Sequence, residues 1–163
     1  MIAIRQAKPE DLGQITAIYN EAVTNTTATF DTEEKTIEER KVWFENRDEN
    51  FPILVAEKNN VIAGYIALNK WSERKAYDIT AEISVYVNSK FRGQGIGKLL
   101  VQTMVARAQE SNLVSLIARI TEGNEQSIYL HKLVGFEVMG VMKKAGKKFE
   151  KLLDVTFMQK MLS

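Results

Sequence analysis

The sequence predicts a single mixed α/β domain, and three patterns support that fold class. Residues 83–87 alternate apolar and polar side chains, which is the period of a half-buried strand. A glycine-dense turn at residues 93–97 leads into an amphipathic helix that begins at Ile96. Strand and helix patterns keep alternating along the chain, without linkers or internal repeats. We therefore expect one domain over residues 1–163, with a mixed sheet of about six to seven strands and about four flanking helices.

The N-terminal third predicts one strand followed by two helices. Residues 2–6 are expected to form a short strand, and Pro9 then opens a helix because its fixed φ suits a first turn. The threonine-rich residues 24–29 have no period and are expected to form a loop. The capping box Thr36-Ile37-Glu38-Glu39 starts a second helix, in which Trp43 and Phe44 are expected to pack into the core.

The rest of the chain predicts the remaining sheet and one further helix. Asn59-Asn60 is a hairpin signal between two strands, and residues 71–78 are a polar loop before the central strand. A helix is expected at residues 124–134, and a loop is expected at residues 143–148. The other strands are expected at residues 53–57, 61–68, 113–120, 136–142 and 149–161.

Composition excludes several classes of function. The net charge of +1 gives no broad basic face for nucleic acid. The chain has no cysteine, which excludes disulfides, thiolate metal sites and a cysteine acyl carrier, and we expect no metal cofactor. The N-terminal residues do not resemble a secretory signal, and no apolar run reaches membrane-spanning length. We therefore expect a cytoplasmic protein that does not bind a membrane.

The glycine-dense turn is the main functional signal. Three glycines within residues 93–97 leave backbone N–H groups bare at a helix N-terminus, where the helix dipole favours an anion. A Walker A loop or a dinucleotide fingerprint that starts at Gly93 needs glycine where Lys98 stands, so neither motif fits. The pattern Arg92-x-x-Gly95-x-Gly97 does fit a pyrophosphate-binding turn. A plain turn between strand and helix is the alternative that these six residues alone leave open.

A second pattern places the chain beside a known family. Asn124, Ser127, Leu130, His131 and Gly135-Phe136 match N-x-x-[AS]-x-x-L-[YH]-x-x-x-G-F. With the glycine turn, this pattern resembles the GNAT N-acetyltransferases. Further segments are similar to the phosphinothricin and methionine sulfoximine acetyltransferase group, and the similarity covers nearly the whole chain. It implies the GNAT fold and transfer of acetyl from acetyl-CoA to the α-amine of a small amino acid.

The resemblance also implies how the cofactor is held. In the family the central strand separates from the next strand at a bulge, and its free backbone pairs with pantetheine. The turn takes the pyrophosphate, and Asn124 contacts the cofactor, although it also suits a helix N-cap. The cofactor-binding residues expected on this basis are Val85, Tyr86, Val87, Arg92, Gly93, Gln94, Gly95, Ile96, Gly97, Lys98, Asn124 and Ser127.

Two residues are candidates for proton transfer. Glu82 is an acid in an apolar strand, and strand alternation places it on one face with Ser84 and Tyr86. It occupies the family's general-base position, and its alternative role is that of an ordinary solvent-facing residue. His131 is the only histidine, and it stands where many GNAT enzymes have tyrosine. It is a candidate acid for the leaving thiolate, and a structural role is the alternative.

The acceptor site is the least specified part of the sequence. An amino-acid carboxylate needs a cation, which Arg74 or Lys75 in the loop before the central strand would supply. Phe30 and Tyr77 are candidate walls for the acceptor side chain, and Ser84 is a candidate contact.

Apolar residues from Leu152 to Leu162 suggest either a homodimer interface, as the resembling family would have, or a last core strand. Acetylation of another small amine or of a protein N-terminus, and a non-catalytic acyl-CoA-binding module, are the alternative functions.

Overall fold

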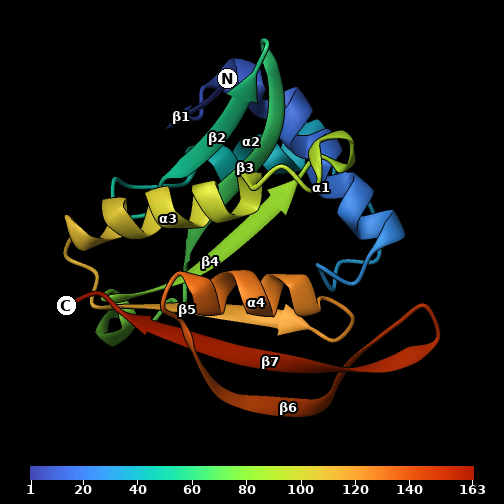
Figure 1. The fold of residues 1–163 in the computed structure, drawn as a ribbon, viewed down its shortest axis with the longest axis vertical. Coiled ribbons are helices and arrows are strands. Elements are labelled where there is room, and N and C mark those ends of the chain that lie inside the picture. The colour runs from blue at the N-terminus through green and yellow to red at the C-terminus, as the bar shows by residue number, and fades with distance from the viewer.

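The computed structural model describes all residues 1–163 as a seven-stranded sheet with four α-helices (Figure 1). The strand order is β1-β2-β3-β4-β5-β7-β6, and only β4 and β5 run parallel. The elements follow the predicted order, and the mixed α/β class is confirmed. They are β1 (Ile2–Gln6), α1 (Leu12–Asn25), α2 (Ile37–Glu45), β2 (Ile53–Lys58), β3 (Val61–Lys70), β4 (Thr80–Val87), α3 (Ile96–Gln109), β5 (Ser115–Thr121), α4 (Glu125–Leu133), β6 (Glu137–Lys148) and β7 (Lys151–Met161).

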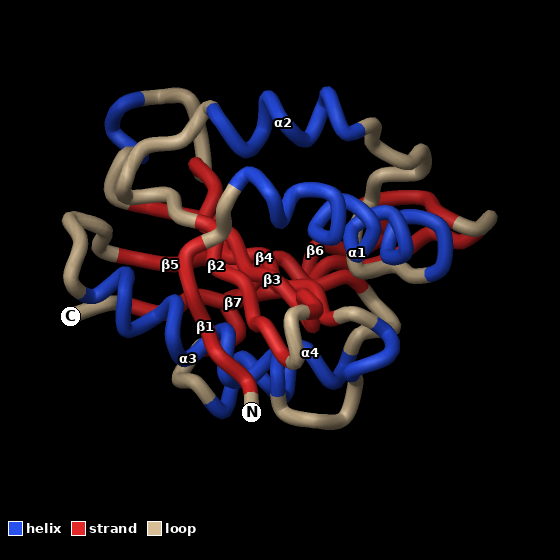
Figure 2. The backbone as a smooth tube through the Cα atoms, turned by 90° about the horizontal axis from the view of Figure 1, so that it is seen from above, coloured by secondary structure: helices blue, strands red, loops and turns tan.

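The helices cover the sheet in two pairs, with α1 and α2 on one face and α3 and α4 on the other (Figure 2). The larger core cluster lies under α3 and includes Leu100 and Met104, which are fully buried. The smaller cluster lies under α1 and includes Ile15 and Val55. Because burying one such side chain contributes about 1.5–3 kcal/mol, the two clusters hold both faces of the sheet in place.

The sheet separates between its two parallel strands. Pairing of β4 with β5 covers only Thr80–Glu82 against Ser115–Ile117, whereas β5 pairs with β7 along its whole length. Beyond Glu82 the two strands diverge in a V, which Figure 1 shows. The backbone of residues 83–87 therefore has no strand on that side. The family pattern implies a bulge here, but the register between β3 and β4 is continuous, so the strands separate without one.

The C-terminal hairpin differs from the prediction. Residues 143–148, which were expected to form a loop, continue strand β6. The turn lies instead at Phe149 and Glu150, which have φ of 53° and 63°. Lys144 also has a positive φ, and the register shifts between Met142 and Gly146. This irregularity bends the strand without ending it, and the basic composition of the segment concealed the continuation.

Other boundaries differ by a few residues. Helix α1 extends to Asn25, into the segment that was expected to be a loop. The capping box at the start of α2 is confirmed, with Thr36 and Glu39 each bonding the other's backbone N–H. The Asn59-Asn60 hairpin is confirmed, because both residues have the positive φ of a type I′ turn. No helix of the chain is long and apolar enough to cross a membrane.

Candidate active site: two clefts that meet at the separation of the sheet

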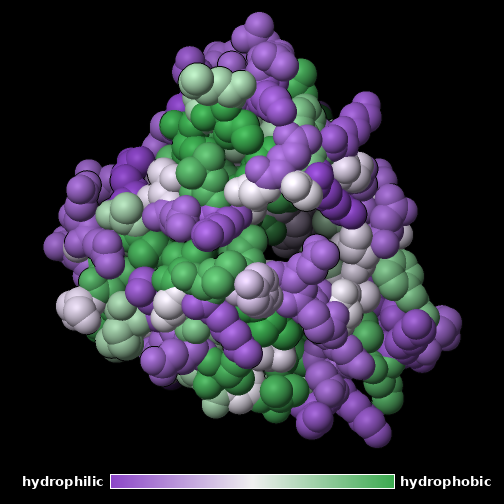
Figure 3. All heavy atoms as spheres, in the orientation of Figure 1, coloured by the Kyte–Doolittle hydropathy of each residue, from purple (hydrophilic) through white to green (hydrophobic).

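A cleft of about 890 Å³ lies where β4 and β5 separate, and we call it the α3 cleft. Its walls come from the C-terminal half of α1 and the loop after it, β4, the start of α3, α4 and the tip of the β6–β7 hairpin. Figure 3 shows the surface hollowed in this region, between α3 and α4, with hydrophilic residues along the rim. The cleft therefore gives access to the unpaired edge of β4.

The N-terminus of α3 forms one end of the α3 cleft. Gly95 caps the helix with φ of 78°, and no side chain accepts from the first amides. Gly93 has the same φ, and a Cβ at either residue would meet no atom within 4 Å, so this turn faces open space. The N–H groups of the first helical turn have no partner within a helix. Bare amides, a positive helix dipole and the nearby Arg92 and Lys98 together suit a pyrophosphate.

Gly97 has a different role from the other two glycines. A Cβ there would lie 3.0 Å from Cδ1 of Leu130 and 3.6 Å from Cγ2 of Val87. Glycine at this position therefore lets α3 pack closely against α4 and β4. The sequence motif thus combines two requirements, an open turn for an anion and a close helix contact.

The structure brings most of the expected cofactor residues to one place. All of them line the α3 cleft except Gln94, whose side chain accepts a hydrogen bond from Nζ of Lys58 at 2.9 Å on the outer surface. Asn124 precedes α4, but its side chain makes no capping bond. Its amide is therefore free for another partner, and it lines the cleft.

Sequence reasoning missed the other side of the α3 cleft. Thr26, Thr27 and Gly123 line it, as do Lys148 and Phe149 at the tip of the β6–β7 hairpin. Lys148 is 4% exposed, and its Nζ donates to the carbonyl oxygen of Thr29 at 2.8 Å. Burial lowers the pKa of Lys148. Because these residues come from three segments that are distant in sequence, no local sequence motif indicates that they lie in one cleft.

A second cleft of about 790 Å³ lies on the other face of the sheet, against α2, and we call it the α2 cleft. Glu82, Ser84 and Tyr86 line it together, so the predicted alternation along β4 is correct. Phe30 lines it from the loop after α1. Two residues, Ala28 and Tyr86, line both clefts. The clefts therefore meet at the point where β4 leaves β5.

Glu82 stands at this point and is paired with an arginine that the sequence analysis did not single out. It is the last residue of β4 that pairs with β5. Nε of Arg119 lies 2.7 Å from Oε2 of Glu82, and Nη2 lies 2.8 Å from Oε1. The Glu82 side chain is 16% exposed. Both carboxylate oxygens are thus oriented by one guanidinium, and the pKa of Arg119 is raised mainly by that hydrogen bond.

Three tyrosines form an aromatic wall in the α2 cleft. Tyr65 stacks on Tyr86, with ring centroids 5.4 Å apart, and Tyr19 meets Tyr86 edge-on at 5.4 Å. Burial raises the pKa of Tyr86 well above its usual 10.0 and raises the pKa of Tyr19 to about 12. The hydroxyl of Tyr19 donates to Asp31. Both phenols therefore stay protonated at neutral pH.

Arg40 is a charged residue of the α2 cleft that lies next to these tyrosines. It is 7% exposed, and its guanidinium carbon lies 3.6 Å from the Trp43 ring centroid and 4.3 Å from that of Tyr19. Cation–π contacts of this kind contribute about 0.5–2 kcal/mol each. Trp43 and Phe44 pack, partly buried, against the smaller core cluster as expected, and Trp43 also lines the cleft. Arg40 falls within the predicted second helix, and no sequence motif gave it a functional role.

His131 is not in the lining of either cleft. It is 2% exposed, and its Nδ1 lies 2.7 Å from the carbonyl oxygen of Ser127, so Nδ1–H donates there. Its ring meets Phe136 edge-on at 5.0 Å, and Nε2 is buried without a partner. Burial lowers its pKa. A neutral imidazole held in this way is a poor proton donor at neutral pH.

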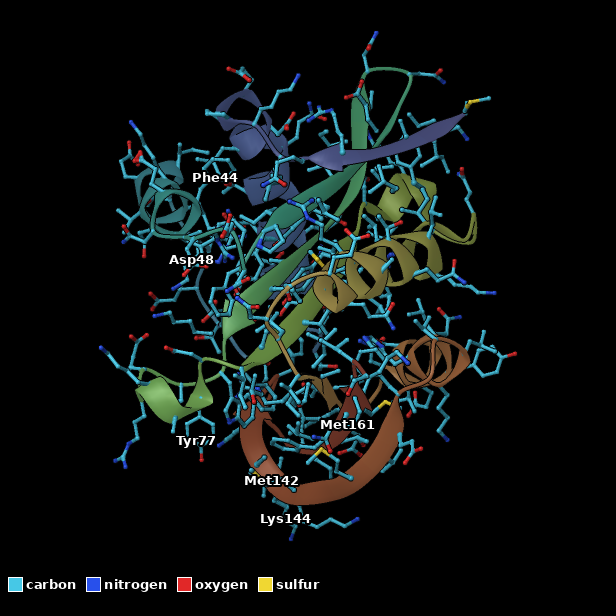
Figure 4. All side chains as sticks on the ribbon, turned by 90° about the vertical axis from the view of Figure 1, so that its left-hand side faces the viewer. Phe44, Asp48, Tyr77, Met142, Lys144 and Met161 are labelled. Carbon is cyan, nitrogen blue, oxygen red and sulfur yellow. The ribbon has the colours of Figure 1, made fainter.

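Three of the expected acceptor-binding residues lie away from the clefts of this chain. Arg74, Lys75 and Tyr77 are exposed in the loop between β3 and β4, and they line neither cleft. Figure 4 shows Tyr77 on a loop that projects away from the sheet. Phe30, Ser84 and Glu82 are brought together in the α2 cleft, but the predicted cations are not.

Comparison with known proteins agrees with this architecture. The family model of the acetyltransferase (GNAT) domain matches residues 4–157. An L-methionine sulfoximine/L-methionine sulfone acetyltransferase from Pseudomonas aeruginosa is 41% identical over 159 residues, covering 96% of this chain and 92% of the relative.

Two solved structures are also close. A ribosomal-protein-alanine N-acetyltransferase from Brucella melitensis has a TM-score of 0.94 at 41% identity, covering 98% of this chain and 99% of that one. A phosphinothricin acetyltransferase from Sinorhizobium meliloti, in complex with acetyl-CoA, has a TM-score of 0.96 at 35% identity, covering 99% and 89%.

The chain belongs to the GNAT acetyltransferase family. It is an acetyl-CoA-dependent N-acetyltransferase, and the predicted fold, enzyme class and cosubstrate are confirmed. The non-catalytic acyl-CoA-binding module is the alternative that these findings remove.

Proposed function

We propose that this enzyme acetylates the α-amine of a small amino acid or analogue, of the methionine sulfoximine, methionine sulfone or phosphinothricin type. The observation that carries the proposal is the junction of the two clefts at Tyr86, with Glu82 beside it on β4. A donor held in one cleft and an amine held in the other would meet through the separated sheet. The acceptors named for the relatives support the choice of substrate.

We assign the α3 cleft to acetyl-CoA. The glycine turn and the first amides of α3, with Arg92 and Lys98, would hold the pyrophosphate. The free edge of β4 at Val85–Val87 would pair with the pantetheine amides as an added strand does. Asn124, which precedes α4, and Ser127 in α4 would contact the cofactor. Acetyl-CoA supplies an activated thioester, and holding it in line with the amine accounts for much of the rate.

We assign proton removal to Glu82. The reaction forms a C–N bond and breaks a C–S bond, and the attacking amine has to lose one proton. Glu82 lies in the α2 cleft, and Arg119 fixes the direction of its carboxylate. Each oxygen keeps a lone pair for an amine or for a bridging water. For the leaving thiolate we assign Tyr86 in place of His131, because Tyr86 lines both clefts and burial keeps it protonated.

An acceptor screen tests the proposal. The protein is mixed with acetyl-CoA, and release of the CoA thiol is measured with methionine sulfone, methionine sulfoximine, phosphinothricin, ordinary amino acids and a peptide with an N-terminal alanine. The peptide is included because of the acceptor named for the Brucella relative. We expect turnover with at least one amino-acid analogue. Turnover with the peptide alone would replace the proposed acceptor class with a protein N-terminus.

We also propose that the enzyme is a homodimer that pairs through β6, although the sequence pointed to residues 152–162. Met158 of that segment is buried in the core, whereas β6 is an edge strand exposed over its first nine residues. Figure 4 shows Met142 on this outer strand. A long exposed edge with apolar side chains favours pairing with a second copy. The exposed apolar residues of the hairpin are Val138, Met139, Val141, Met142, Phe149, Leu152 and Met161.

Light scattering tests the dimer. The wild-type protein should have twice the mass of the 18.5 kDa chain at micromolar concentration. Val141→Asp should shift it to the monomer, whereas Val42→Asp, on an even more exposed valine of α2, should not. A wild-type monomer would remove the proposal. That residues 1–163 form one domain, and that the protein is cytoplasmic, stay predictions.

A further inference from the structure

The α2 cleft contains a buried cation without an anionic partner. Arg40 forms no ion pair with any carboxylate of the chain. Its Nη2 donates to the Tyr65 hydroxyl at 3.0 Å, its Nε is buried without a partner, and its Nη1 makes no hydrogen bond. A buried charge normally has a partner of opposite sign, so this guanidinium is set to receive one.

The carboxylates that line the same cleft are already engaged. Asp31 accepts from Tyr19, Glu39 accepts from the backbone N–H of Thr36, and Glu82 accepts twice from Arg119. Lys35 also lines the cleft, but it is only half-buried, and it lies in a loop. Arg40 is therefore the cation held in place by packing and free to bind an anion.

Arg40 lies where the body of a bound acceptor would reach it. Tyr86 marks the junction of the clefts, Tyr65 stacks on Tyr86, and the Tyr65 hydroxyl binds Arg40. An acceptor whose amine lies at Tyr86 and whose body lies along this aromatic wall would extend toward Arg40. Trp43 and Tyr19 hold the guanidinium between their rings, which fixes it before the acceptor binds.

We propose that Arg40 is the specificity-determining residue that binds an oxygen-bearing group of the acceptor through its free Nη1–H. An amino-acid analogue offers two such groups, the α-carboxylate and an oxidised side-chain head such as a sulfone. Both are hydrogen-bond acceptors for a guanidinium, and the carboxylate adds a negative charge. This inference rests on the acceptor class proposed above.

Three acceptors separate the two groups. L-methionine sulfone has both, L-methionine has only the carboxylate, and L-methionine sulfone carboxamide keeps the sulfone but has a neutral amide in place of the charged carboxylate. The value of kcat/KM is measured for each with the wild type, Arg40→Met, Arg40→Lys and the control Lys41→Gln. Lys41 is the next residue of α2, is exposed and lies outside the cleft, so its loss removes the same charge elsewhere.

Arg40→Met should lower kcat/KM about 10- to 100-fold for acceptors that carry the group Arg40 binds, and less than threefold for the acceptor without it. A loss with methionine and methionine sulfone, but not with the carboxamide, identifies the carboxylate. A loss with both sulfones, but not with methionine, identifies the side-chain head. Lys41→Gln should change none of them.

Equal losses on all three acceptors, or no loss on any, would overturn the proposal, because Arg40 would then be a packing residue or irrelevant to the acceptor. If Arg40→Met does not fold, Arg40→Lys keeps the charge without the planar fork and should give a smaller loss of the same pattern. Acetyl-CoA affinity, measured by calorimetry, should stay unchanged in both variants. A wild-type enzyme that binds acetyl-CoA but acetylates none of these three acceptors, nor methionine sulfoximine or phosphinothricin, would overturn the acceptor class itself.

Discussion

The two clefts differ in how much of each comes from one stretch of chain. The α3 cleft takes its phosphate-binding end and its free strand edge from residues 85–98. The α2 cleft is assembled from β3, β4, β5, β6, β7, α1, α2 and the loop between the helices, and its charged residues lie far apart in sequence. The phosphate-binding end of the α3 cleft therefore depends on local backbone geometry, whereas the α2 cleft depends throughout on long-range packing.

The difference predicts that single substitutions will separate the functions of the two clefts. A substitution in the turn before α3 should weaken acetyl-CoA binding and leave the KM for the acceptor unchanged. A substitution around the α2 cleft should raise the KM for the acceptor and leave acetyl-CoA binding unchanged. Glu82, which lies at the junction, should affect turnover without weakening acetyl-CoA binding.

The largest effect is expected at the junction. Glu82→Gln keeps the shape of the side chain and removes its basicity, so kcat should fall about 100-fold or more. The deficit should shrink as pH rises, because more of the acceptor amine then arrives deprotonated; the reference pKa of an α-amine in peptides is about 7.7–8.0. Steady-state kinetics from pH 6 to 9.5 measures both effects. Wild-type kcat at pH 7 would show that another base acts.

The next effect is expected at the α3 cleft. Gly95→Asp puts a side chain at φ of 78° and a negative charge where the pyrophosphate is proposed to bind. Acetyl-CoA affinity should fall about 10- to 100-fold by calorimetry. Gly13→Asp is the matched control, because that glycine lies exposed in α1 and a Cβ there would meet no atom within 4 Å. Equal affinity in the two variants would place the pyrophosphate elsewhere.

A smaller effect is expected at the α2 cleft. A Cβ on Gly146 would come within 2.5–2.9 Å of the Phe30 ring, so Gly146→Ala has to displace a wall of this cleft. The ring can swing, and we expect a KM for the acceptor raised about 3- to 10-fold with unchanged acetyl-CoA affinity. Gly140→Ala on the same strand, with open space around it, serves as the control. A weakened acetyl-CoA affinity would show that the clefts are coupled there.

The smallest effect on turnover is expected at His131, which lies outside both clefts. His131→Gln should keep kcat within about threefold of wild type, whereas Tyr86→Phe should lower kcat about 10-fold. A large loss of kcat in a folded His131→Gln protein would restore the histidine as the acid.

The lowered pKa of His131 also predicts a pH dependence of stability. Below its unfolded pKa of about 6.5, the unfolded chain binds a proton that the folded chain resists. The free energy of unfolding should therefore fall as pH drops from 7 toward the folded pKa, by at most about 1.4 kcal/mol for each pH unit. Denaturant unfolding of the wild type and of His131→Gln should show this slope only in the wild type.

The sequence by itself determined the order of the elements and the phosphate-binding end of the site. Alternation in β4, the glycine turn and the capping box of α2 are local features, and backbone geometry decides each within a few residues. The placement of Glu82, Ser84 and Tyr86 on one face follows from the same period of two.

Only the tertiary structure decided which charges meet. The sequence analysis chose Arg74 and Lys75 as cations because they precede β4, yet the α2 cleft contains Arg40 and Arg119, which come from α2 and β5. Arg119 reaches Glu82 because β4 and β5 are parallel neighbours, although 37 positions separate the residues in sequence. Arg40 reaches the cleft because α2 packs over β3 through Trp43 and Tyr65. Contacts of this kind depend on how whole elements pack, and no local pattern encodes them.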